Sequence, residues 1–433
     1  MIETIPPFEL TTQKMQALDD ELSQYHAIYS PLFRRREQRA WSLAYLAGLL
    51  RPDLPNKSVE TMVLTMQGAD ANQIRAMQQF VGQGVWEDRP ILQRHWQEVA
   101  ADLEEADGVL LVDGSDFLKQ GGDSVGVKRQ YCGEVGKRAN CQAGVFLAYA
   151  SQHGATLLDR RLYLPREWVE DAAFAERRAQ CGVPDAIVFQ TKLELAVAMI
   201  REVRQSRHLR CRWLVCDEGF ARSSDFLDQV AETGLWYFGE VPLDTQVWLQ
   251  PPAVAVPTWS GQGRPPAQPR LLPNAPTAQE VRVIAAALPA DAWSRHIIQE
   301  GAKGPLVAEM ALLRVVSTRA GLPGPAVWLV LRRHGTSGEL KAYLSNAPAA
   351  IEPRTLVRMS GMRWPVEQCF EDSKQLLGMG DYQVRSWQGW HHHMTLVILA
   401  HFFLVRLQQR LKKRTGSHAT ASLSLAARHL APA

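Results

Sequence analysis

The stretch from Arg363 to Lys374 combines acids and bases at helical spacing. Four charged residues share one face of the helix that this stretch predicts: Arg363, Glu367, Glu371 and Lys374. A neighbouring apolar stripe predicts a face towards a core: Val366, Phe370 and Leu377. On spacing alone, acids and bases that alternate along one face are more typical of a solvated row of ion pairs.

Two other stretches favour a chemical role, because each offers an isolated aspartate at the end of a strand-like apolar run. These runs are 109–113 and 213–217, and they end at Asp113 and Asp217. Carboxylates from distant parts of a chain can bracket two divalent ions about 3.5–4 Å apart, which activate an attacking oxygen and neutralise a leaving one. Hard oxygen ligands suit Mg²⁺, with Mn²⁺ as a substitute. We therefore expect Asp113, Asp217 and Glu367 to form a two-metal phosphodiester site.

Three further acids compete for these roles. Asp116 lies towards a polar turn and is a weaker ligand candidate than Asp113, and Glu218 points away from Asp217 if the strand continues. Glu371 lies one helical turn from Glu367 and is the alternative third carboxylate.

The elements that would position these acids change in type along the chain. Residues 1–105 show helical periodicity, with Ser58 as an N-cap and a break at 68–70. This pattern fits either a helical DNA-binding domain or an ordinary bundle. From 106 to 242, strand-like runs in close succession, including 141–150 and 155–164, predict an antiparallel meander. Helical patterns at 168–181 and 191–206 and strands at 213–217 and 236–241 follow.

Residues 243–345 predict an insertion into this sheet domain. A Pro/Gly-rich stretch that contains Trp259 opens it and reads as a surface linker, and strands follow at 307–316, 326–333 and 341–345. Residues 346–433 predict the second part of the sheet domain and C-terminal helices, with a mobile tail. The fold class that we expect is α/β: an RNase H-like mixed-sheet catalytic domain, interrupted by a β-rich insertion, with a helical N-terminal DNA-binding domain.

Composition sets broad limits on function. The 433 residues are 46% hydrophobic and 21% charged, which is typical of a folded domain protein. The 48 Lys+Arg and 45 Asp+Glu give a net charge of +3, which neither favours nor opposes a nucleic-acid partner. The six cysteines form no C-x-x-C pair, so reduced thiols are expected. Without an apolar signal segment or spanning run, we expect a cytoplasmic protein with no membrane partner.

The motifs also carry a family resemblance. Arg363-x3-Glu367-x6-Lys374 resembles part of the Tyr-x2-Arg-x3-Glu-x6-Lys signature of cut-and-paste bacterial insertion-sequence transposases of the DDE type, and the chain looks most like those of the IS-701 type. Further segments resemble that group in the same order: 112–121, 124–131, 140–145, 162–168, 213–220 and 381–390. The resemblance extends from about Tyr29 to Arg406 and is densest around the predicted carboxylates.

This resemblance implies roles for individual residues. Asp113, Asp217 and Glu367 match the metal-binding triad, and Arg363 and Lys374 match positions that contact DNA near the transposon end. The signature tyrosine falls on Ser360, which cannot stack and offers a shorter hydroxyl, so that DNA contact is weaker here or supplied elsewhere.

Other residues are candidates for DNA contacts because of their positive charge or aromatic ring, independently of the resemblance. Lys128 and Arg129 lie beside Tyr131 and could line a DNA channel, with a solvated loop as the alternative. Arg34 and Arg35 open a predicted helix at the end that the helix dipole disfavours for cations, which makes a purely structural role less favourable. Trp259 could stack on an extruded base.

The run 391–393 contains three histidines, but adjacent helical residues point about 100° apart and cannot converge on one ion. A structural role or a phosphate contact is expected for these histidines instead of a metal site.

The sequence thus predicts a transposase that binds double-stranded DNA, both the terminal inverted repeats and a target, and that acts as a homodimer on DNA. Two alternatives stay open. One is a non-catalytic DNA-binding descendant of a transposase, and the other is an RNase H-like nuclease without strand transfer.

Overall fold

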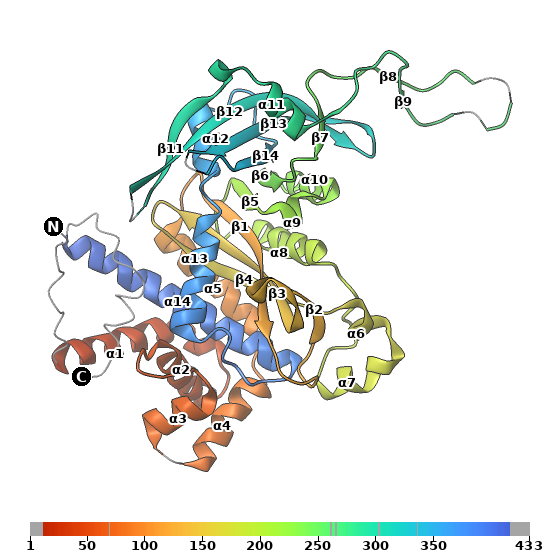
Figure 1. The fold of residues 1–433 in the computed structure, drawn as a ribbon. Coiled ribbons are helices and arrows are strands. Elements are labelled where there is room, and N and C mark those ends of the chain that lie inside the picture. Colours follow the sequence, from red (N-terminus) through yellow and green to blue (C-terminus); the bar gives the residue numbers. More distant parts are fainter. Residues whose placement is uncertain are drawn as a thin grey trace. The chain divides into compact units, whose positions relative to one another are not determined.

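The computed structural model describes residues 12–68, 70–259, 262–264, 266–301, 304–335 and 337–415. The chain divides into two compact units (Figure 1). The first unit combines residues up to 108, residues 112–210 and residues from 365 onward, and the second combines 109–111 with 211–364. The predicted C-terminal tail and the first residues of the predicted helical region lie outside the described residues.

The first unit begins with helices. They are α1 (Thr12–Ala27), α2 (Arg36–Leu50), α3 (Val59–Gln67), α4 (Ala71–Gly82) and α5 (Asp88–Leu103), with a short 3-10 turn at Ser30–Leu32. Ser58 caps α3 as predicted, because its side chain accepts a hydrogen bond from the Thr61 amide. The break between α3 and α4 falls at residues 68–70, where Gly68 has a positive φ of 81°.

Four antiparallel strands follow: β1 (Val109–Leu118), β2 (Lys128–Cys132), β3 (Lys137–Ser151) and β4 (Gly154–Tyr163). The first three residues of β1 belong to the second unit and the rest of the strand to the first. β3 pairs with β2 through its first residues and with β4 through its remainder. Lys128 and Arg129 therefore stand on a strand, because their segment pairs with 140–141 of β3.

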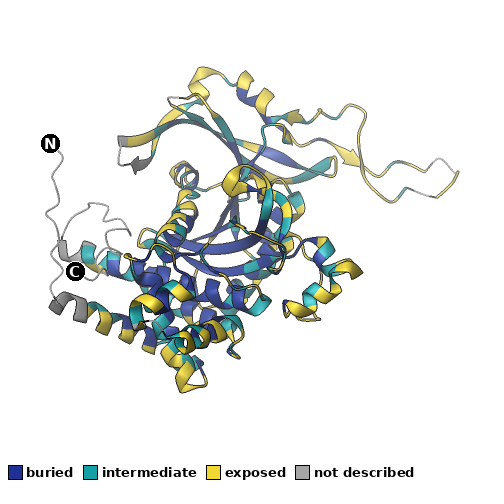
Figure 2. Cartoon of the chain, turned by 60° about the horizontal axis from the view of Figure 1, so that its bottom comes forward, coloured by how far each residue is buried: buried dark blue, intermediate teal, exposed yellow. Residues whose placement is uncertain are grey.

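Helices of the first unit complete its core around the strands. They are α6 (Arg166–Glu170), α7 (Ala175–Gln180), α8 (Lys192–Ser206), α13 (Trp364–Leu377), whose residues from 365 belong to this unit, and α14 (Trp387–Thr415). The single helix expected at 168–181 is broken, because Asp171 caps a new turn at Ala172–Phe174. Buried residues gather on β3, β4 and the middle of α14 (Figure 2).

The second unit contains the parallel pair β5 (Trp213–Cys216) and β6 (Trp236–Val241). Between them lie α9 (Glu218–Ala221) and α10 (Ser224–Glu232). The sheet continues antiparallel from β6 through β14 (Leu340–Ser345) and β13 (Leu322–His334) to β12 (Gly304–Arg319). One parallel pair among antiparallel ones makes this a mixed sheet, as predicted.

The remaining elements of the second unit are short, apart from β11 (Ser294–Gly301), which pairs with β12. They are β7 (Gln246–Trp248), β10 (Gln279–Glu280), α11 (Val281–Ala287), the 3-10 turn Ala290–Ala292 and α12 (Pro353–Met359). In the Pro/Gly-rich stretch, β8 (Val254–Ala255) and β9 (Arg270–Leu271) form a separate, largely exposed two-stranded ribbon (Figure 2). Among the described residues, no helix has the length and apolar character needed to cross a lipid bilayer.

Candidate active site

Asp113 lies in β1, directly after the buried residues 109–112, and is itself half-buried. Its carboxylate oxygen Oδ1 accepts a hydrogen bond from the Gly114 amide at 2.7 Å. Because side chains alternate along a strand, Asp113 faces the same side of the sheet as Phe117. That side is the one that meets α13, since the Lys374 ammonium lies 5.5 Å from the centre of the Phe117 ring.

The alignment of β1 with β3 is set by two contacts. The Lys119 amide donates to the Asn140 carbonyl at 3.0 Å, and a Cβ atom at Gly114 would lie 3.8 Å from the Gly144 carbonyl oxygen. Residue numbers rise on one strand as they fall on the other, so the strands are antiparallel. Residues of β3 that follow Gly144 therefore run beside residues of β1 that precede Gly114.

Two further contacts give the direction of α13. Near its C-terminal end, Lys374 Nζ donates to the Asp116 carbonyl oxygen at 3.3 Å. One turn earlier, the Phe370 ring meets the Phe146 ring edge-on, with centroids 5.4 Å apart. Phe146 lies two residues beyond Gly144 and hence alongside the earlier part of β1. Helix α13 and strand β1 therefore run in the same direction.

This register relates Glu367 to Asp113. Glu367 precedes Lys374 by seven residues, which is about 10.5 Å along a helix and returns to nearly the same face. Asp113 precedes Asp116 by three residues, which is about 10 Å along a strand. Glu367 and Asp113 therefore lie at similar distances from the contact at Lys374, one along α13 and the other along β1. Glu367 is exposed.

The expected helix faces of α13 are confirmed. The apolar stripe is buried, at Val366, Phe370 and Leu377, while Glu367 and Glu371 are exposed. Sequence reasoning did not single out Phe117 and Phe146, although both stand in the apolar alternation of their strands and both contact α13 or its neighbours.

The sequence patterns also did not single out Asp372, which lies on the buried side of α13. Desolvation by burial raises the pKa of its carboxyl to about 6, the Gln368 amide that donates to it at 3.0 Å lowers that pKa, and the charge of Glu371 raises it.

Asp217 belongs to the second unit and directly follows β5. It is the N-cap of α9, with Oδ1 accepting from the Phe220 amide at 3.2 Å, and it is half-buried. Glu218 is the first residue of α9 and exposed. Strand β5 thus ends one residue earlier than expected, because Asp217 has already begun the cap.

Arg363 also belongs to the second unit and precedes α13, which begins at Trp364. Its guanidinium lies 3.5 Å from the Glu240 carboxylate, which also pairs with Lys341 at 3.0 Å. Ser360, at the signature tyrosine position, is buried and donates its hydroxyl hydrogen to the Val357 carbonyl at 2.7 Å. That hydroxyl is thus engaged within α12.

Two of the predicted DNA-contacting lysines carry ion pairs. Lys374 lies 3.0 Å from the Glu134 carboxylate, with about 29% of its side chain exposed, and Lys128 pairs with Glu167. Partly exposed pairs of this kind are worth about 0.2–1 kcal/mol, so an incoming phosphate can compete for either lysine.

The other predicted DNA contacts are solvent-exposed. Arg34 lies 3.6 Å from the Glu87 carboxylate, Arg35 is the N-cap residue of α2, and Arg129 stands exposed on β2. The Trp259 indole is 51% exposed and donates to the Gly263 carbonyl at 3.2 Å.

The histidine run is structural. His392 and His393 are buried, and the His392 ring stacks on Trp86 at 3.5 Å between centroids. The His393 ring lies 2.8 Å from the Tyr45 hydroxyl. Burial lowers the pKa of the His391 and His393 rings to about 3. His391, beside His392 and His393, is half-buried. These contacts support the structural role, which is one of the two roles expected for the run.

The donor chemistry of the predicted triad fits a hard divalent cation, because all three residues are carboxylates and none is fully buried, Asp113 and Asp217 being half-buried and Glu367 exposed. Within the part of the chain that the structure describes, no three His, Cys, Asp or Glu residues form a group that could hold a metal ion. The pair Asp113 and Glu367 belongs to the first unit, and Asp217 to the second.

The chain was compared with known proteins. A family model described as DDE superfamily endonuclease matches residues 29–305, which is more than half of the chain. None of the curated proteins is significantly similar to it.

Proposed function

Because the chain belongs to the DDE superfamily of endonucleases, we propose that it is a DDE transposase of the cut-and-paste, insertion-sequence type. It binds double-stranded DNA at the terminal inverted repeats, cuts there, and joins the freed 3′ hydroxyl ends to target DNA. The observation that supports this most directly is the parallel course of α13 and β1, along which Glu367 and Asp113 lie at similar distances from the contact between Lys374 and Asp116. The IS-701 subtype is part of the same proposal.

The proposed architecture is an RNase H-like catalytic domain with a β-rich insertion and a helical N-terminal DNA-binding domain. Asp113 and Glu367 act together with Asp217 as the ligands of two Mg²⁺ ions, for which Mn²⁺ can substitute. Nucleases of the DDE superfamily typically use divalent metals, and such ions when bound supply an activated water and neutralise the leaving oxygen.

The residues themselves have distinct tasks. Gly114 donates its amide to Asp113 and restrains the carboxylate before any ligand arrives. Asp217 is oriented by its bond to the Phe220 amide. Arg363 and Lys374 hold backbone phosphates of the transposon end, and Lys128, Arg129, Arg34 and Arg35 add phosphate contacts. Trp259 stacks on a base extruded at the cleaved end. Two copies act on DNA, since two ends must be joined.

The triad is tested by three substitutions, Asp113→Asn, Asp217→Asn and Glu367→Gln, in a cleavage assay on transposon-end duplexes with Mg²⁺. We expect each to lower the cleavage rate at least about 100-fold while DNA binding persists, because each removes a ligand charge without removing the cationic contacts. Glu371→Gln and Glu218→Gln are matched controls, since both acids are exposed neighbours of a triad member. Cleavage that persists in all three variants would refute the assignment.

A nuclease that cuts without joining is the second candidate, favoured by the family's description as an endonuclease. A strand-transfer assay separates the two, because only a transposase links labelled end DNA covalently to a target plasmid. A non-catalytic DNA-binding descendant would bind ends but leave them uncut.

A further inference from the structure

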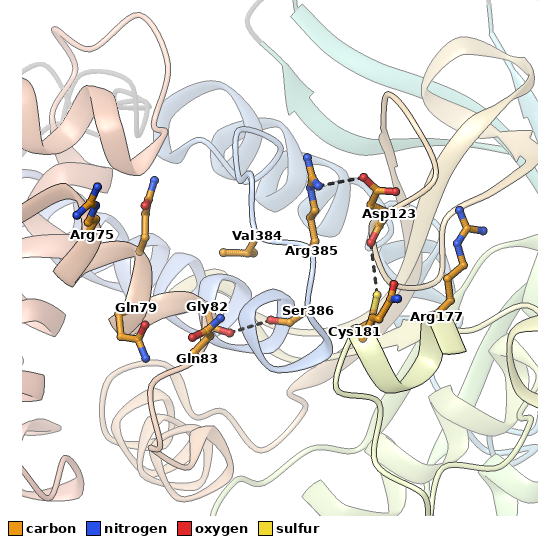
Figure 3. A pocket seen from close by; sticks show the side chains of 12 residues that line it. Arg75, Gln79, Gly82, Gln83, Asp123, Arg177, Cys181, Val384, Arg385 and Ser386 are labelled. Atoms are coloured by element: carbon orange, nitrogen blue, oxygen red, sulfur yellow. Dashed lines mark hydrogen bonds and ion pairs between the residues drawn. The ribbon is translucent and has the colours of Figure 1, made fainter. Parts of the chain in front are cut away.

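A polar cleft lies within the first unit, apart from the predicted carboxylates. It is a cavity of about 780 Å³, lined by α4, by the end of α7 and by residues 384–386 (Figure 3). A second cavity of about 540 Å³ shares Gln78, Val384 and Arg385 with it. Five cations line the two: Lys57, Arg75, Lys119, Arg177 and Arg385. Six glutamines do so as well: Gln78, Gln79, Gln83, Gln120, Gln180 and Gln383.

One face of α4 supplies the wall richest in these side chains. Arg75, Gln78, Gln79 and Gln83 follow helical spacing and are exposed, whereas the opposite face of α4 is buried at Met77, Phe80 and Val81. Within the described part of the chain, Arg75 has neither an ion pair nor a hydrogen bond. Helix α4 therefore presents unengaged donors and acceptors to the cleft.

Helix α3 ends at Gln67 and α4 begins at Ala71, with Gly68 at a positive φ directly after α3. Two short helices in close succession form the arrangement in which the second helix carries base-contacting residues in helix-turn-helix proteins. Here the second helix is the one with the arginine and glutamine face.

The facing wall is held in place by hydrogen bonds. The Arg385 carbonyl accepts from the Val125 amide at 2.9 Å, and the Trp387 amide donates to the Cys181 carbonyl at 2.8 Å. Ser386 ties this wall to α4, since its hydroxyl donates to the Gly82 carbonyl at 2.8 Å (Figure 3). A wall fixed in this way is a preorganised binding surface.

Of the cations of the cleft, Arg385 is open to an incoming anion, whereas the Lys57 ammonium is not. Lys57 is 4% exposed, and its ammonium nitrogen is buried without a hydrogen-bond partner among the described residues. Arg385 pairs with Asp123 at 3.0 Å, but both side chains are 69% exposed, so this pair is weak.

We propose that this cleft is a sequence-reading DNA site, in which Gln78, Gln79 and Arg75 of α4 contact base edges while Arg385 holds a phosphate. Glutamine and arginine suit this task because they bond in pairs to adenine and guanine edges in the major groove. The proposal rests on the proposed function for the identity of the DNA, which is the transposon end.

The experiment uses the full-length protein and a pool of random duplexes, from which wild-type protein selects preferred sequences. Binding of the selected duplex and of a shuffled duplex is then measured by fluorescence anisotropy over a range of salt concentrations. For Gln78→Ala with Gln79→Ala, we expect the affinity for the selected duplex to fall about 10–100-fold, with little change for the shuffled one. For Arg385→Gln, we expect weaker binding to both duplexes and a shallower salt dependence, by about one unit of slope.

Two controls accompany these variants. Asn72→Ala removes an exposed amide from α4 that does not line the cleft, and Arg282→Gln removes an exposed arginine from α11. Both should bind as wild type. Thermal unfolding of every variant verifies that it is folded.

The outcomes separate this proposal from the catalytic one. Wild-type discrimination in the Gln78/Gln79 variant would overturn the reading role of α4, and the cleavage assay on triad variants would be unaffected. Displacement of duplex by inorganic phosphate, at a phosphate concentration matched to that of a duplex competitor, would show a small-anion site and also overturn the proposal. A wild-type protein that binds no DNA would overturn both this proposal and the transposase.

Discussion

At the scale of single residues, carboxylates form ion pairs with several of the cations that are proposed to contact DNA. The clearest case is Lys374, whose ammonium contacts both the Asp116 carbonyl oxygen and the Glu134 carboxylate. The first of these contacts joins α13 to the backbone of β1. The second is an ion pair at a partly exposed site, and it competes with any phosphate for the same charge.

Glu134→Gln should therefore strengthen DNA binding. We expect the affinity for duplex DNA to rise about 1.5–5-fold, because the cost of breaking a pair worth about 0.2–1 kcal/mol disappears. Anisotropy titrations measure this, with Glu170→Gln as the control, since Glu170 pairs with Arg166 at an exposed site. An equal rise in both variants would mean that only net charge matters and that Lys374 does not touch DNA.

Sequence reasoning found residues whose role depends on their own type and on near neighbours. Ser58 was identifiable as a cap because the cap residue and its helix are adjacent in sequence. Contacts such as those between Lys374 and Glu134, or between Lys128 and Glu167, join residues that are far apart in the sequence. No local pattern encodes these contacts, so they were not predicted.

At the scale of elements, apolar periodicity was a good guide where one face is buried. The strands at 141–150, 155–164 and 236–241 and the helix at 191–206 were placed within a few residues. Strand β2 was missed because its residues are charged and mostly unburied, and its pairing with β3 alone makes it a strand. Asp171 broke an expected helix by capping a new turn within it.

The contact between β3 and α13 predicts the effect of a small substitution. A Cβ atom at Gly144 would lie 2.6 Å from the Phe146 ring and 3.1 Å from the Trp390 ring. Gly144→Ala should cost about 1–3 kcal/mol of unfolding free energy, because Phe146 also packs against Phe370 and has little room to move.

Chemical unfolding measures this cost. Gly114→Ala is the matched control on the facing strand, where the nearest atom is 3.8 Å away and ordinary contact is expected. The same loss of stability in both variants would mean that strand conformation, and not the ring cluster, sets the cost. A selective loss in Gly144→Ala should also slow cleavage, since Phe370 is one turn from Glu367.

At the scale of the whole molecule, the first unit buries many histidines. Desolvation lowers the pKa of the His26, His95 and His392 rings to about 4, and that of the His391, His393 and His401 rings to about 3. A group whose pKa is depressed by folding binds its proton more readily in the unfolded chain.

The free energy of unfolding should therefore fall as the pH decreases from about 6.5 towards about 4, because over this range the histidines bind protons in the unfolded state but not in the folded state. Asp372 acts in the opposite sense over part of this range, because its pKa of about 6 favours the folded state as pH falls. Urea unfolding at a series of pH values measures the sum, and His401→Gln should flatten the profile. A midpoint that does not change between pH 7 and about pH 5 would contradict the histidine account.

The overall fold was only partly predictable. The mixed sheet followed from the order of strand and helix patterns, because βαβ order implies the parallel pair that β5 and β6 form. The extension of that sheet through β14 to β12 depends on long-range pairing between residues about a hundred positions apart, which periodicity does not reveal.

The first unit is assembled from three separate stretches of chain, the last of which begins at residue 365. That last stretch carries Glu367 and the fully buried Trp390, Met394 and Phe402. Nearly the whole polypeptide must therefore be synthesised before the core of the first unit can form. A chain that ended before residue 365 would lack these buried side chains and Glu367, so it would form neither a complete first unit nor the full set of proposed acids.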